Sequence, residues 1–169
     1  MRTVVVFAIA GALGAAIQTA LPHRIPFLPA APDLILVLVV YLGLHFHSAG
    51  GALGAFLLGY LLDTSAGIAP GLSCLTMTLV FGVVYLLSRR LWMENPVSNV
   101  AAVALGEGLK VVTVLLFFAV GVPGGVPWLS LARTLGFEAL FAVLLTPFIF
   151  SALDAQLGRP RAARAREAD

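Results

Sequence analysis

Residues 32–63 read PDLILVLVVYLGLHFHSAGGALGAFLLGYLLD, and this stretch decides the fold class. It contains two apolar runs, 34–44 and 49–62, separated by the short segment HFHS. Within it, only Asp33 and Asp63 are acidic, and neither Lys nor Arg occurs. Runs that are apolar on every face are typical of helices in a hydrophobic surrounding. The stretch therefore predicts two hydrophobic helices joined by a short loop.

The composition of the whole chain points the same way. Of its 169 residues, 60% are hydrophobic and 11% are charged, and the mean hydropathy is +1.03. Soluble domains contain about 45–50% apolar and about 25% charged residues. A disulfide-stapled secreted module is excluded, since Cys74 is the only cysteine. We therefore expect an all-α polytopic membrane protein with a single domain.

Apolar runs between polar residues predict six transmembrane helices. Their expected ranges are 3–21, 33–46, 49 to between 63 and 67, 71–88, 99–120 and 128–153. The second is too short for a hydrocarbon core of ~30 Å, so it starts its crossing in the proline-rich segment or lies buried among its neighbours. The first is longer than a typical signal-peptide core, and we expect a retained anchor. Residues 1–157 thus form the transmembrane domain, and residues 158–169 a disordered basic tail.

Arginine and lysine residues near the helix ends predict the orientation. With the N-terminus in the cytoplasm, seven of them lie on that side and two on the other. The seven are Arg2, Arg89, Arg90, Arg159, Arg161, Arg164 and Arg166, and the two are Arg24 and Arg133. Both termini are therefore expected on the cytoplasmic side of the membrane. The tail arginines either contact anionic lipid head groups or only fix this topology.

The sequence lacks the common motifs of catalysis and phosphate binding. The chain has no GxSxG, GxGxxG or GxxxxGK[ST] motif. His45 and His47 are two residues apart, which points their rings to different helix faces, and no acidic or cysteine residue lies nearby to complete a metal site. We expect no enzyme activity, no metal, no cofactor and no nucleic-acid partner.

Ionisable residues inside the last two expected helices form a candidate polar cluster. Glu107 and Lys110 are three residues apart and share a helix face. Lys110 lies about 16 Å from the inner boundary and Glu138 about 15 Å from the outer one, so both are near the midplane. Such charges are costly in a bilayer and need partners. We expect Lys110 to pair with Glu138, with Glu107 nearby, either to fix helix packing or to form a site for a substrate or a partner helix.

Two aspartates are expected at the outer surface. Asp33 follows Pro32 at a helix start, where an acid is favoured, and capping accounts for it. Asp63 is near the outer end of the third helix, where the helix dipole disfavours a negative charge. It is expected to open the turn 63–67, or to meet Asp33 or Arg24.

Small residues recur every four positions in two of the expected helices, which allows close approach of a second helix. Either stripe faces the interior of the molecule or another protein. The stripes are Gly51, Ala55 and Gly59 in the third helix and Ala8, Ala12 and Ala16 in the first.

A specific family resemblance rests on the order of four motifs. These are PDLIL at 32–36, YLGL at 41–44, GGALGAFLLGYLLD at 50–63 and the glycine turn at 67–72. Together they resemble the core signature of the rod shape-determining MreD family, with Ala55 in place of a glycine. The last two helices resemble the family only in being hydrophobic, so the family assigns no role to the polar cluster.

The resemblance implies a non-enzymatic inner-membrane subunit of the bacterial cell-elongation machinery, which builds peptidoglycan. Members associate with the single-pass scaffold protein MreC, and through it with MreB filaments, the glycosyltransferase RodA and its transpeptidase partner. The family fold is similar to that of the substrate-binding S components of energy-coupling-factor vitamin transporters.

Two alternative functions follow from the same residues. A vitamin-capture subunit would need an outer pocket with several polar groups. The candidates are His23, Arg24, Asp33, Asp63, Thr64 and Ser65. An ion or proton carrier would use Glu107, Lys110 and Glu138, but one such cluster without further protonatable groups makes a poor relay.

Overall fold

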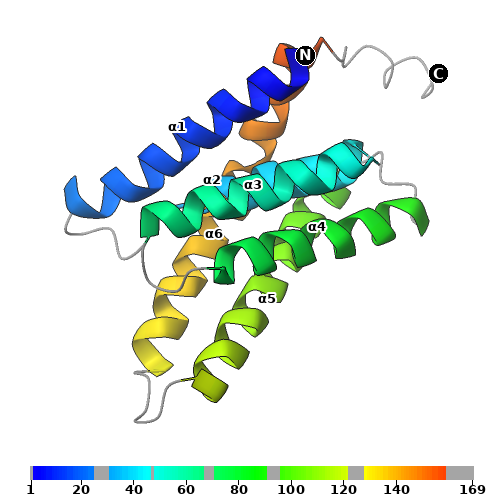
Figure 1. Ribbon diagram of the computed structural model, residues 1–169. Coiled ribbons are helices and arrows are strands. Elements are labelled where there is room, and N and C mark those ends of the chain that lie inside the picture. The colour runs from blue at the N-terminus through cyan, green and yellow to red at the C-terminus, as the bar shows by residue number, and fades with distance from the viewer. Residues whose placement is uncertain are drawn as a thin grey trace.

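The computed structural model describes residues 2–24, 31–46, 48–66, 71–90, 96–121 and 128–158. These ranges contain six helices and no strand. In chain order they are α1 (Arg2–Arg24), α2 (Leu34–His45), α3 (Ala49–Ala66), α4 (Leu72–Arg90), α5 (Pro96–Gly121) and α6 (Trp128–Leu157) (Figure 1). The predicted all-α class and the order of the helices are confirmed. Of the expected basic tail, residues 159–169 lie outside the described part of the chain.

Three of the helices are long and apolar enough to cross a membrane. The qualifying segments are Leu72–Arg89 in α4, Val97–Ala119 in α5 and Leu131–Leu157 in α6. Shorter apolar segments, Val5–Ala20 and Leu34–His45, form most of α1 and all of α2. That all six helices cross the bilayer stays a prediction.

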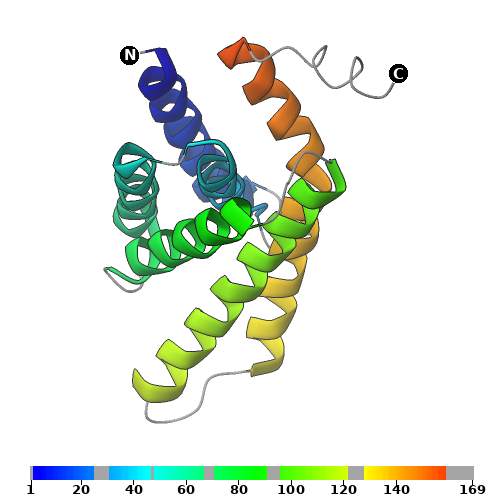
Figure 2. The ribbon, with the colours of Figure 1, turned by 90° about the vertical axis from the view of Figure 1, so that its right-hand side faces the viewer.

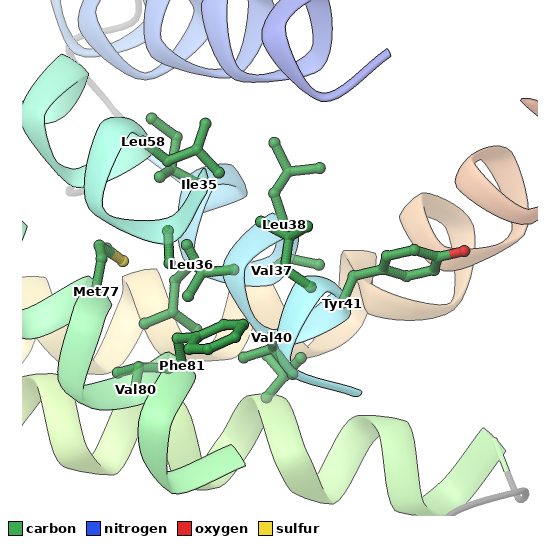
Figure 3. Packing of buried hydrophobic residues seen from close by; sticks show 14 of the residues in the cluster. Ile35, Leu36, Val37, Leu38, Val40, Tyr41, Leu58, Met77, Val80 and Phe81 are labelled. Atoms are coloured by element: carbon green, nitrogen blue, oxygen red, sulfur yellow. The ribbon is translucent and has the colours of Figure 1, made fainter. Parts of the chain in front are cut away.

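Helix α2 lies at the centre of the molecule. Every residue from Ile35 to Leu44 is buried, and α2 contacts all five of the other helices (Figure 3). Its 12 residues span only about 18 Å, well short of a hydrocarbon core of ~30 Å. Of the two explanations for its shortness, burial among neighbouring helices is therefore correct. A helix that is hydrophobic on all sides suits this position.

Helices α5 and α6 run antiparallel, side by side (Figures 1 and 2). The start of α1 and the end of α6 lie at one end of the molecule, and the end of α5 and the start of α6 lie at the other. A chain with an even number of crossings has both of its ends on one side of the membrane, as the start of α1 and the end of α6 are placed here. Which side of the bilayer each end faces stays a prediction.

Two helix boundaries differ from the expected ones. Helix α5 begins at Pro96, three residues before Asn99, because proline is well suited to the first position of a helix. Helix α6 continues four residues past Leu153. The continuation carries Asp154, whose carboxylate accepts a hydrogen bond of 2.7 Å from the hydroxyl of the buried Tyr41.

The small-residue stripe of α3 packs inside the molecule. A Cβ at Gly59 would lie 2.7 Å from the Cα atom of Cys74 in α4, and Ala55 is fully buried. A Cβ at Gly51 would lie 2.6 Å from the carbonyl oxygen of Phe46. The stripe thus allows α3 and α4 to approach closely.

The second stripe, on α1, does not face the interior. Ala8, Ala12 and Ala16 are exposed, whereas the neighbouring Gly11 and Ala15 are buried. Helix α1 therefore packs against the other helices through the face that carries Gly11 and Ala15, next to the predicted stripe.

Candidate functional site

Lys110 of α5 lies between two carboxylates from two other helices. Its Nζ atom is 2.6 Å from Oδ2 of Asp33, at the start of α2, and 2.7 Å from Oε2 of Glu138 in α6. Charge-assisted hydrogen bonds of this length are among the strong ones. The predicted pairing of Lys110 with Glu138 is confirmed. Asp33 is a second partner that the sequence interpretation missed.

Asp33 is not at the outer surface, where it was expected, because only 2% of it is exposed. The expected capping role is confirmed, since its Oδ1 atom accepts a hydrogen bond from the amide of Leu36 at 3.0 Å. The same oxygen accepts from Nε2 of Gln18 in α1 at 2.9 Å. The surface prediction was wrong because α2 is short and central, so that its first residue lies inside the bundle. The unusual shortness of this apolar run was the signal for that position.

Glu107 lies one helical turn before Lys110 and is buried, with 2% of its surface exposed. Its charge is close enough to interact with those of Lys110, Asp33 and Glu138, so its predicted place beside the pair is confirmed. Among the described residues, neither carboxylate oxygen of Glu107 has a hydrogen-bond partner. The cluster thus contains three carboxylates and one ammonium group.

An open groove runs between α5 and α6 beside this cluster, and we call it the α5–α6 groove. Its volume is about 520 Å³. Glu107 lines it, together with apolar side chains and the small residues Ala104, Gly108, Ala132, Gly136 and Ala139. No described atom lies within 4 Å of a Cβ built at Gly108 or at Gly136. These glycines are therefore not packed against any other helix in the described part of the chain.

Asp63 caps the start of α4, which corrects the expectation of a turn at 63–67. Helix α3 continues to Ala66, and the Asp63 carboxylate accepts hydrogen bonds from the amides of Gly71, Ser73 and Cys74 at 2.9–3.1 Å. Both of its oxygens are used at this helix start, and no bond joins it to Asp33 in the described part of the chain. The side chain of Arg24, its other expected partner, lies outside the described residues. The dipole conflict of α3 is relieved because the N-terminus of α4 attracts the carboxylate.

Replacing Asp63 by alanine is expected to cost about 1–2 kcal/mol of stability, because three amides at the start of α4 lose their acceptor. The midpoint of thermal unfolding in detergent, followed by far-ultraviolet circular dichroism, measures the loss. Thr64→Ala is the matched control, since the Thr64 hydroxyl is exposed and, among the described residues, bonds only to carbonyls of its own helix. Equal midpoints for the two variants would contradict the capping role.

A family model for the rod shape-determining protein MreD matches residues 1–155. The chain belongs to the MreD family. No curated protein and no solved structure matches it. Membership gives this chain a role in rod shape determination and cell elongation, and its apolar helices fit a membrane protein. The likeness to S components of vitamin transporters stays a prediction.

In this MreD-family chain, the cluster joins helices that are far apart in sequence. Through Lys110 it ties the start of α2 to the middle of α5 and to α6, and through Gln18 it reaches α1. Within the described ranges, no group of three histidine, cysteine or acidic residues is placed to hold a metal ion. The arrangement therefore acts as a polar tie between four helices, with Glu107 as its one member lacking a hydrogen-bond partner among the described residues.

Proposed function

We propose that this chain is a non-enzymatic subunit of the cell-elongation complex in the bacterial inner membrane. In this proposal it crosses the bilayer six times with both termini in the cytoplasm. It binds MreC and connects it to RodA and its transpeptidase partner, while MreB filaments are linked indirectly. The observation that carries the proposal is the match of the MreD family model over residues 1–155.

The use of polar groups within the chain supports a scaffold over the alternative of vitamin capture. A capture pocket needs several polar groups free to hold a ligand. Of the side chains expected to supply them, Asp33 is held by Lys110, Leu36 and Gln18. Asp63 is held by the amides of α4. Two cavities lie beside α1, and both have mostly apolar linings. The first is lined mainly by α1 and α3, and the second by α1, α2 and α6.

Copurification tests this function. The full chain with an affinity tag is co-expressed with the MreC protein of the same bacterium and extracted in detergent. We expect MreC to be recovered in stoichiometric amount, and an unrelated single-pass membrane protein at the same expression level not to be recovered. A folded, monodisperse sample without MreC would count against the proposal. Recovery of a bound vitamin in stoichiometric amount would instead favour the transporter alternative.

A further inference from the structure

Glu107 is in an unfavourable position for the isolated chain. Its side chain is buried, and both oxygens lack a hydrogen-bond partner among the described residues. A buried polar group without a partner destabilises the folded chain, and a charged one does so more strongly. The argument holds in either protonation state, because a neutral carboxyl group also has a donor and an acceptor to satisfy. The other two acids of the cluster differ, since each is bonded to Lys110.

The charges around Glu107 favour a donor or a cation as its missing partner. Three acidic side chains meet here with one ammonium group, that of Lys110, whose Nζ atom already bonds to Asp33 and Glu138. An added hydrogen-bond donor would satisfy Glu107, and an added cation would also offset the excess negative charge. A lipid acyl chain has neither a hydrogen-bond donor nor a positive charge, so it cannot serve as this partner.

The groove beside Glu107 has the surface that membrane helices use to associate. Helix pairs in bilayers pack through small residues that let backbones approach closely. Here Gly108 and Gly136 face open space from opposite sides of the groove, and Ala104, Ala132 and Ala139 also line it. The partnerless acid and the small-residue surface therefore occupy the same place.

We propose that the α5–α6 groove receives a membrane-spanning helix of a partner protein, which presents a hydrogen-bond donor to Glu107. The donor is a side chain such as that of Arg, Lys, Asn, Gln, Ser or Thr. The choice of probe rests on the proposed function: the partner is taken from the elongation complex, and MreC, with its single span, is the protein tested.

Photocrosslinking locates the partner helix. The full chain is co-expressed with MreC, with p-benzoylphenylalanine in place of Leu140, which lines the groove and is exposed, or in place of Leu75, an exposed residue of α4. We expect a crosslink to the MreC span from position 140, at least tenfold stronger than from position 75. A crosslink from position 140 only to lipid or to a second copy of this chain would overturn the inference.

Paired glycine variants test whether the groove is needed. Gly136→Leu places a side chain in the groove, whereas Gly82→Leu places one in α4 where a Cβ also meets no described atom within 4 Å. We expect Gly136→Leu to reduce the recovered MreC at least tenfold, and Gly82→Leu to leave it unchanged. If both variants recover MreC as the wild type does, the groove is not the docking site.

Glu107→Leu separates recognition from folding. We expect it to lower MreC recovery at least tenfold while the isolated chain unfolds at the same temperature or higher, because the variant removes a partnerless buried acid. A fall in unfolding temperature with unchanged MreC recovery would show that Glu107 serves only the fold.

MreC bound to the wild type but crosslinked elsewhere would overturn this inference and leave the proposed function intact. Absence of MreC from the wild-type sample would contradict the proposed function, and the inference with it.

Discussion

Replacing Lys110 by methionine is expected to destabilise the folded chain by about 3–5 kcal/mol, because it leaves the buried Asp33 and the partly buried Glu138 without their cation. The Asp33 and Glu138 oxygens lie 2.6 and 2.7 Å from the ammonium nitrogen and come from different helices. Without it, the mutual repulsion of the two carboxylates and the burial of Asp33 would both oppose the packing of α2, α5 and α6. Removing an exposed charge at the surface is not expected to cause the same loss of stability.

Thiol reactivity during thermal unfolding in detergent measures this effect, since Cys74 is the only cysteine and is buried in the folded chain. Arg133→Gln removes an exposed cation of α6 and is expected to change stability by no more than about 0.5 kcal/mol. The triple variant Asp33→Asn, Lys110→Met and Glu138→Gln removes all the paired charges and should recover much of the loss. If Lys110→Met unfolds at the same temperature as Arg133→Gln, the cluster does not hold the helices together.

Gly59→Ala is expected to cost about 2–3 kcal/mol, although alanine normally stabilises a helix relative to glycine. The added Cβ would lie 2.7 Å from both the carbonyl oxygen of Ser73 and the Cα atom of Cys74. These are backbone atoms, so relief requires α3 and α4 to move apart. Such a movement would also stretch the bonds from Asp63 to the start of α4.

Gly82→Ala is the matched control, because a Cβ there meets no described atom within 4 Å. It should leave stability unchanged or raise it by up to about 1 kcal/mol through helix propensity. Circular dichroism melts of the two variants in the same detergent give the comparison. Gly59→Ala variants that are as stable as Gly82→Ala would mean that α3 and α4 are not in close contact at this point.

Much of the fold could be predicted from local pattern. Apolar runs and polar breaks located all six helices, because hydrophobic periodicity and helix punctuation are properties of neighbouring residues. The spacing of Glu107 and Lys110 and a depth estimate for Glu138 were enough to predict the ion pair, since both helices were treated as long spans. Capping by Asp33 could be read from the preceding proline.

The missed features depend on how the helices pack. Asp33 was placed at the surface because each span was assumed to begin at a membrane boundary, whereas α2 begins inside the bundle. The partner of Asp63 was missed because the acceptor and the amides of α4 are separated by a connection whose path the sequence does not specify. Glu107 was expected near Lys110, but only three-dimensional packing shows that both of its oxygens lack a partner among the described residues and that it lines a groove.

Depletion of this protein in the bacterium that carries its gene tests the central claim most directly. Cell length and width are measured by microscopy after depletion, with re-expression of the wild-type chain as the control. The account predicts that depleted cells become round, that the wild-type chain restores rods, and that Lys110→Met does not. Depleted cells that keep their length and width would contradict a role for this chain in cell elongation.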